Sequence, residues 1–345
     1  MSTPRILWRQ NQGLILAVLL FTVLYGIYAG LQPRGYNAFI ANSNVNQGFA
    51  IALASMAQTV PVLTRGLDLS IGAITTLVDC LASVLVNGPP WHVALGLIAC
   101  LAAGIGCGLL NGCIIVYGRI QPIIATLATG AIFMGLALLL RPTPGGKISD
   151  ALSNALTYEL GDAMPAALHA KLFDYVPMEL VILVLVVSVI WLPFRRSIIG
   201  RGCYAAGSSE AAAYMAGVNV SASKLSAYAM AGLLAAIGGI FLGLQTQSGD
   251  ANVGQAGLLT LDSIAAVVIG GTSLMGGIGG CLGSLFGAYI LTTINAMLQV
   301  ANTILWIIPA SPLIQPLFEG MVLLFAVSAG AGRVFWIRNR LDLFR

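Results

Sequence analysis

The sequence has few of the residues that enzymes use for chemistry. Only 8% of its 345 residues are charged, and it contains 2 histidines, His92 and His169. Its 6 cysteines form no C-x-x-C pair. We therefore expect no metal centre, no disulfide framework and no histidine-based catalytic site, and we expect no cofactor.

The motifs of nucleotide hydrolysis and of common hydrolases are also missing. The string closest to a P-loop, PGGKIS at 144–149, lacks the first glycine of G-x-x-x-x-G-K-[ST] and lacks a hydroxyl residue directly after the lysine. No G-x-S-x-G or H-E-x-x-H string occurs. The chain is not expected to be an enzyme, so energy for its work has to come from another subunit or from an ion gradient.

Apolar residues take the place of charge. They make up 58% of the chain, and the mean hydropathy is +0.92, values typical of a polytopic membrane protein. The net charge of +4 is spread over span ends and forms no basic stripe. The bilayer is therefore an expected partner, and nucleic acid is not.

Ten apolar windows approach the ~20 residues that cross a bilayer. They lie at 14–32, 46–64, 71–88, 91–117, 120–140, 177–194, 224–248, 258–275, 280–300 and 312–331. The first window is too long for the core of a secretory signal and is interpreted as a retained span. The sequence predicts a single all-α polytopic membrane domain over 1–345, with about ten transmembrane helices.

The basic residues predict its orientation. With both termini cytoplasmic, ten spans leave Arg34, Arg141, Lys147 and Lys171 outside and place the other twelve of the 16 basic residues inside, as the positive-inside rule requires. The segment 141–176 becomes an outer loop, either merely solvated or in contact with a periplasmic partner. The charged segment 195–223 becomes a cytoplasmic loop that stands in water, where only another protein can use it.

Five spans on each side of the outer loop allow a 5+5 inverted repeat. The strings LDLSIGA at 67–73 and LDSIAA at 261–266 are weakly similar and support it. Glycines at four-residue spacing, such as Gly104, Gly108 and Gly112, predict close helix packing, static or sliding.

Polar residues inside the predicted spans indicate a path for a solute. The carboxylates Asp79, Asp262 and Glu319 are costly in a membrane, so they face a wet cavity, are protonated, or lie at helix ends. Uncharged polar residues are more common there, which favours a neutral polyhydroxyl solute over an ion. For each of these residues taken alone, hydrogen bonding between helices is the favoured explanation. The predicted path residues are Gln58, Asp68, Asp79, Asn111, Asp262, Thr272, Ser273 and Asn295.

Four blocks of sequence, in order, resemble the permease subunits of bacterial ABC importers for monosaccharides, the ribose, xylose and galactose type. The blocks are RGLDLSIG at 65–72, QPIIATL at 121–127, the segment from Gly200 to Asn219, and LDSIAAVVIGGTSL at 261–274 followed by Gly276 and Gly277. The resemblance covers nearly the whole chain.

The resemblance implies an inner-membrane permease with several partners. These are two cytoplasmic ABC ATPase subunits or one double-length ATPase, a second permease subunit that is identical or different, and a periplasmic sugar-binding protein. It also implies a short helix between Gly207 and Gly217 that docks on the ATPase. The implied coupling residues are Arg201, Gly207, Ser209, Glu210, Ala211, Ala212 and Gly217.

The sequence departs from related patterns at two places. Gly217 is one residue later than in the E-A-A-x-x-x-G signature of other ABC permeases, and Arg65 stands where relatives commonly have a small residue. The alternatives to a sugar permease are a branched-chain amino acid or a nucleoside ABC permease. The zwitterionic amino acid would require fixed charge or exposed helix termini along its path. An ion-coupled transporter, which needs no docking loop, and a membrane enzyme are less favoured.

Overall fold

The computed structural model describes residues 12–33, 35–157 and 176–305, with four further helical positions, Leu317, Gly320, Met321 and Leu324. The regular elements in these ranges are helices, and no strand occurs among them. In chain order they are α2 (Gln12–Gly30), α3 (Ala38–Leu63), α4 (Ile71–Leu85), α5 (Pro90–Val116), α6 (Pro122–Leu140), α7 (Asp150–Thr157), α8 (Met178–Leu185), η2 (Val186–Trp191), α9 (Leu192–Arg196), α10 (Ile198–Ser208), α11 (Glu210–Met215), α12 (Val220–Thr246), α13 (Val253–Ile269) and α14 (Cys281–Leu305).

Nine of the ten predicted windows coincide with helices, with α8, η2 and α9 forming one continuous span. Six of these nine are long and apolar enough to cross a membrane by length and composition. The exceptions are α3, which carries more polar residues, and the shorter α4 and α13. The tenth window, with Glu319, lies almost wholly outside the described residues. The count of ten spans and the cytoplasmic termini stay predictions.

The predicted end of the eighth window, 258–275, is wrong, because the helix ends six residues before it. Helix α13 stops at Ile269, because Gly270 and Gly271 turn the chain and Gly271 adopts a φ of +80°. Hydropathy could not reveal this, since the residues that follow remain small and uncharged. The chain instead forms a loop rich in glycine, 270–280, before α14 begins.

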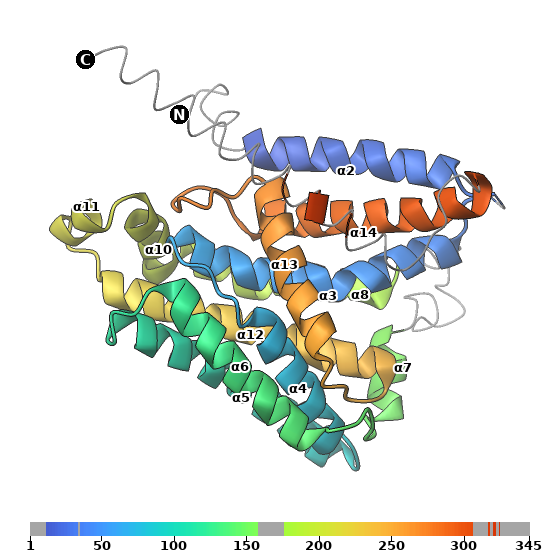
Figure 1. The fold of residues 1–345 in the computed structure, drawn as a ribbon, viewed down its shortest axis with the longest axis horizontal. Helices are drawn as coiled ribbons and strands as arrows, with labels where there is room; N and C mark the ends of the chain where they lie inside the picture. Colours follow the sequence, from blue (N-terminus) through green and yellow to red (C-terminus); the bar gives the residue numbers. More distant parts are fainter. Residues whose placement is uncertain are drawn as a thin grey trace.

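Helices α3, α4 and α12 form the centre of the bundle. Helices α2 and α14 cover one side and α5 and α6 the other, with α13 crossing between them (Figure 1). The share of the apolar window that is buried is 72% for α12 but only 11% for α2. Helix α2 thus presents most of its surface to the surroundings, as a lipid-facing helix does.

The two ends of the bundle carry different elements. Helices α10 and α11 lie at one end, and α7 lies near the other (Figure 1). We call these the α11 end and the α7 end. The predicted outer loop, as far as it is described, contributes α7 and an antiparallel bridge between Gly145 and Gly249 at the α7 end.

Glycine packs the central helices closely, as the spacing predicted. A Cβ added at Gly108 of α5 would lie 2.2 Å from the Tyr228 carbonyl oxygen of α12, and one at Gly232 would lie 2.1 Å from the Gly104 carbonyl oxygen. These contacts are the close backbone approach that small residues allow in membranes. Whether the seam slides is a separate question that stays a prediction.

The two strings offered as traces of a repeat do not occupy equivalent positions. Asp68 lies in the turn before α4 begins, whereas Asp262 lies in the middle of α13. Their similarity therefore gives no support to an inverted repeat, which remains a prediction from the number of spans alone.

Candidate functional site

The charged segment between α9 and α12 folds into two short helices. The Ser197 hydroxyl caps α10 by accepting a bond from the Gly200 amide at 2.9 Å. The Ser209 hydroxyl caps α11 by accepting a bond from the Ala212 amide at 3.3 Å. Both caps follow from serine at a helix start. A short helix at this place is what the family resemblance implied.

The expectation that all of 195–223 stands in water is wrong for α10. One face of α10 is buried against α12 and α3, through Gly200, Gly202, Cys203, Ala206 and Gly207. A Cβ added at Gly207 would lie only 1.8 Å from the Leu63 carbonyl oxygen of α3. Gly207 is therefore a packing residue inside the protein, where only a hydrogen atom fits.

Helix α11, by contrast, is almost wholly exposed. Its one buried residue is Ala213, while Tyr214 and Met215 are 74% and 85% exposed. The predicted residues Ala211 and Ala212 are exposed beside them. Large apolar side chains on a short exposed helix are typical of a protein contact. Sequence analysis missed both, although apolar residues within a polar segment were the available signal.

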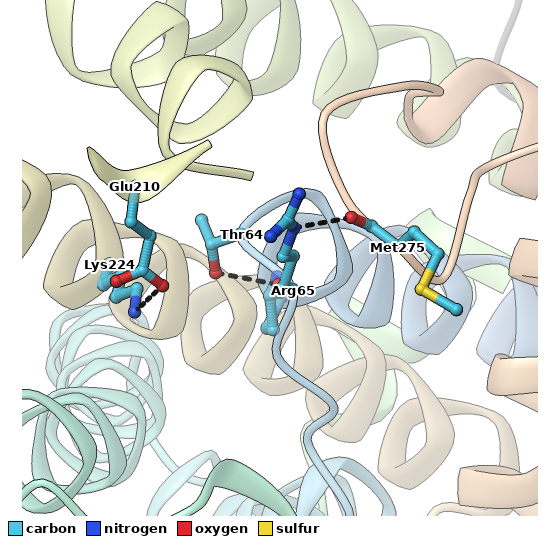
Figure 2. A network of polar contacts seen from close by, with 6 residues as sticks. Thr64, Arg65, Glu210, Lys224 and Met275 are labelled. Atoms are coloured by element: carbon cyan, nitrogen blue, oxygen red, sulfur yellow. Dashed lines mark hydrogen bonds and ion pairs between the residues drawn. The ribbon is translucent and has the colours of Figure 1, made fainter. Parts of the chain in front are cut away.

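Glu210 does not project freely from the start of α11. Its carboxylate lies 2.5 Å from the Lys224 ammonium of α12, and the two side chains are 49% and 22% exposed (Figure 2). An exposed pair of this kind contributes little stability, about 0–1 kcal/mol. Of the other predicted coupling residues, Arg201 is exposed, and its Nε donates to the carbonyl of Ser197, the cap of α10, at 3.4 Å. Gly217 forms the turn after α11 with a φ of +79°.

Arg65 ends α3 in an unusual way. The Gly66 amide bonds to the Pro61 carbonyl at 2.9 Å and the Arg65 amide to the Val62 carbonyl at 3.0 Å, which is the Schellman pattern of helix termination. Arg65 holds the left-handed position of this pattern, with a φ of +64°. Glycine normally takes that position, because a side chain there costs about 1–2 kcal/mol.

The Arg65 side chain joins three segments, which we call the three-way junction: Leu63–Gly66, Tyr204–Ser208 and Met275–Gly279. Its Nε donates to the Met275 carbonyl at 2.9 Å (Figure 2), and its Nη2 donates to the Ser208 carbonyl at 2.6 Å. The Gly277 amide also bonds to the Leu63 carbonyl, at 3.0 Å.

Tyr204 gives the junction a further bond. Its hydroxyl donates to the Gly279 carbonyl at 2.9 Å. Burial raises the pKa of Tyr204 to about 12, so the hydroxyl remains a donor at physiological pH.

Thr272 and Ser273, predicted to line a path, lie in the glycine-rich loop next to this junction. The Thr272 hydroxyl accepts a bond from the Gly280 amide at 3.2 Å, and the Ser273 hydroxyl accepts one from the Met275 amide at 3.2 Å. Both side chains thus fix the shape of the loop. Contact with a passing solute stays a prediction for both.

Gln58, Asp68 and Asn111 form one buried network in the turn between α3 and α4. The Asp68 carboxylate accepts from the Ser70 amide at 2.9 Å and from the Ser70 hydroxyl at 2.5 Å. The Asn111 amide donates to the Ser70 hydroxyl at 2.8 Å. With its amide oriented to suit its neighbours, Gln58 donates to the Asp68 carbonyl at 2.9 Å and accepts from the Asp68 amide at 3.3 Å.

Two threonines of α6 extend this network. The Thr129 hydroxyl donates to the Asn111 side chain at 2.6 Å, and the Thr126 hydroxyl accepts from the Leu69 amide at 2.9 Å. The network therefore ties the turn to α3, α5 and α6. Three predicted path residues are brought together here, but buried from solvent, so their contact with a solute stays a prediction.

The α7 end holds Asp79 and a polar cluster that sequence analysis missed. One oxygen of Asp79 accepts from the Asp250 amide at 3.0 Å, while its Oδ1 is buried without a partner. Glu179 is buried too. Its Oε1 accepts from the Asn46 side-chain amide at 3.0 Å, and its Oε2 has no partner among the described residues. Gln245 donates to the Asn46 carbonyl at 3.1 Å. Glu179 was missed because it lies at the start of the predicted window 177–194, where a charged residue is expected at the end of a span.

The remaining predicted path residues, Asp262 and Asn295, are half-buried on α13 and α14. Asp79 lies on α4, and the Asp68 network lies in the turn before α4 together with Asn111 of α5. The predicted path is thus distributed over the bundle in this conformation rather than gathered in one place. Among the described residues, no group of three histidine, cysteine, aspartate or glutamate side chains is placed to hold a metal.

Comparison with known proteins identifies the family of this chain. The family model described as the branched-chain amino acid transport system permease component matches residues 40–327, which is most of the chain. The chain belongs to this permease family. This helical bundle, with its exposed short helix at one end, is therefore a permease, which is a transport component rather than a catalyst.

Relatives of this permease are sugar importers by name. The ribose import permease protein RbsC of Bacillus subtilis is 32% identical over 318 residues, covering 91% of this chain and 89% of the relative. RbsC of Escherichia coli strain K12 is 32% identical over 331 residues, 93% of each. The fructose import permease protein FrcC of Rhizobium meliloti is 30% identical over 332 residues, 94% of this chain and 85% of the relative. No solved structure matches the permease.

Proposed function

We propose that the chain is the membrane-spanning subunit of an ATP-driven importer that carries a monosaccharide across the bacterial inner membrane. The observation that carries the proposal is the full-length similarity to permeases named for ribose and fructose import. The neutral hydroxyl and amide groups inside the bundle suit a polyhydroxyl solute, because they bind it without holding a fixed charge in the membrane.

The energy would come from a partner that hydrolyses ATP at the α11 end. Tyr214 and Met215 supply the apolar surface for such a contact, and the capped start of α11 presents it in a fixed geometry. The partner is either two ABC ATPase subunits or one double-length ATPase. In this arrangement the α11 end is cytoplasmic, and the coupling residues act there.

Two other partners complete the proposal. A second permease subunit, identical or different, forms the path together with this one, and a periplasmic sugar-binding protein delivers the sugar at the α7 end. The whole chain, 1–345, then works as a single permease domain. ATP-driven closure of the ATPases moves the α11 end and opens the path to one side at a time.

Reconstitution tests this function. The permease, its ATPase and its binding protein are placed in liposomes, and uptake of labelled ribose, xylose, galactose and fructose is measured with and without ATP. We expect one or more of these sugars to accumulate only with ATP. Failure to transport any of them would contradict the sugar assignment.

A branched-chain amino acid is the second candidate, favoured by the description of the family model. The same liposomes, with labelled leucine added outside them, decide between the two. A zwitterion needs fixed charge or exposed helix ends along its path, whereas the polar side chains of the bundle interior are mainly neutral. We therefore expect leucine uptake to stay at the level measured without ATP.

A further inference from the structure

One side chain reaches all three segments of the three-way junction. We propose that Arg65 is a positioning residue that makes the coupling helices α10 and α11, the glycine-rich loop 270–280 and the α3–α4 turn move as one body. The inference rests on the proposed function and deepens it, because it names the contact through which motion of the ATPase would enter the bundle.

The backbone at Arg65 is the first observation. It holds the left-handed position of a Schellman ending, which glycine occupies without strain. An arginine there strains the backbone, so the contacts of its side chain have to compensate. Arg119, in the turn between α5 and α6, also has a positive φ, of +53°. Within the described part of the chain, its exposed side chain makes no hydrogen bond or ion pair. Arg119 therefore has the strained backbone without side-chain bonds that join other segments, which we call the clamp at Arg65.

The geometry of the guanidinium is the second observation. It donates at once to the Ser208 carbonyl and to the Met275 carbonyl, and Figure 2 shows it reaching the glycine-rich loop across the end of α3. Ser208 is the last residue of α10, so its carbonyl has no partner within that helix. A positive charge is also favourable at a helix C-terminus. The rigid fork of arginine can serve two acceptors, which the single ammonium of lysine does less well.

The neighbouring glycines allow the loop 270–280 to come close enough to bond with Arg65. A Cβ added at Gly276 would lie 2.6 Å from the Arg65 Cγ, and one at Gly277 would lie 2.4 Å from the Ser208 hydroxyl oxygen. The loop can therefore approach Arg65 and α10 only because these positions lack side chains. Both also adopt a positive φ, of +77° and +74°.

The Asp68 network makes the link a stiff one. Asp68 follows Arg65 by three residues, and its own amide and carbonyl are both paired with Gln58 of α3. A displacement of α10 that pulls on Arg65 is thus transmitted to the turn instead of being absorbed by loose chain. The α3–α4 turn also bonds to α5 through Asn111 and to α6 through Thr126.

The test compares Arg65→Gly with Arg119→Gly in the complete complex with its ATPase and binding protein. Each change relieves a strained backbone, but only the first removes a clamp. We measure the sugar imported per ATP hydrolysed, and expect Arg65→Gly to lower it about tenfold while ATP hydrolysis itself continues. Arg119→Gly should leave the ratio unchanged, and Arg65→Lys should restore it in part.

Hydrogen exchange on the same complexes separates the clamp from the transport function. Arg65→Gly should speed amide exchange both at the end of α10 and in the loop 270–280, and Arg119→Gly should speed neither. An unchanged sugar-to-ATP ratio in Arg65→Gly, an equal loss in Arg119→Gly, or unchanged exchange would each overturn the inference. A wild-type complex without ATP-driven sugar uptake would instead remove the proposed function, while the exchange data would still decide the clamp.

Discussion

The two ends of the bundle treat buried carboxylates differently. At the α11 end, Asp68 lies in a turn, and a backbone amide, a hydroxyl and a side-chain amide satisfy its oxygens. At the α7 end, Asp79 and Glu179 each keep one buried oxygen without a partner. Asp79 lies inside α4, where the nearby amides are already bonded within the helix, whereas Glu179 lies in the first turn of α8. The α11 end is therefore built to hold its shape, and the α7 end keeps unsatisfied polar groups.

The largest expected effect comes from breaking the satisfied end. Asp68→Ala leaves the amide and the hydroxyl of Ser70 without their acceptor in a buried site, and we expect the free energy of unfolding to fall by about 3 kcal/mol. Thermal unfolding of the detergent-solubilised permease measures it. Asp68→Asn, which sets one amide against the amide of Asn111, should lose about 2 kcal/mol. A stability equal to wild type in both variants would show that the network does not hold the turn.

Gly207→Ala tests the packing of the same end. The added Cβ would lie 1.8 Å from the Leu63 carbonyl oxygen, and overpacking of this kind costs about 1–3 kcal/mol. Gly257→Ala is the matched control, because nothing lies within 4 Å of a Cβ added there. The same unfolding assay should show a lower stability for Gly207→Ala only. Equal stabilities would mean that α10 yields freely at its contact with α3.

Glu179→Gln tests the α7 end. Like Asp68→Asn, it replaces a buried carboxyl group with an amide of the same shape. The new amide oxygen can still accept from the Asn46 side chain, and the amide nitrogen takes the place of the oxygen that has no partner among the described residues. We expect a stability within about 1 kcal/mol of wild type, in contrast to Asp68→Asn. A loss as large as that of Asp68→Asn would abolish the difference between the two ends.

The smallest effect is expected for Glu210→Gln. The exposed pair with Lys224 contributes about 0–1 kcal/mol, so unfolding should shift little, and less at high salt. A marked loss of stability would show that Glu210 is part of the fold rather than of its exposed surface.

Much of the fold could be predicted from the sequence because hydropathy and span length are local properties. Nine windows coincide with helices, and the short helix at Glu210 follows a serine cap. The end of α13 was missed because Gly270 and Gly271 interrupt the helix without interrupting the apolar composition. Long-range contacts were missed as well: the burial of Gly207 depends on Leu63, and the Arg65 clamp on Ser208 and Met275. No local pattern encodes those distances.

We propose above all that a partner ATPase drives the motion of the permease through contact with the exposed helix α11. The direct test is the initial rate of concentrative sugar uptake into liposomes that hold the permease with its ATPase and binding protein, for wild type and for Tyr214→Ala with Met215→Ala. Leu139→Ala serves as the control, since it removes an exposed apolar side chain of α6 that lies outside α11. We predict that the double variant folds but loses ATP-driven uptake, while the control retains it. Undiminished uptake by the double variant, or accumulation of sugar by the permease alone without nucleotide, would contradict the account.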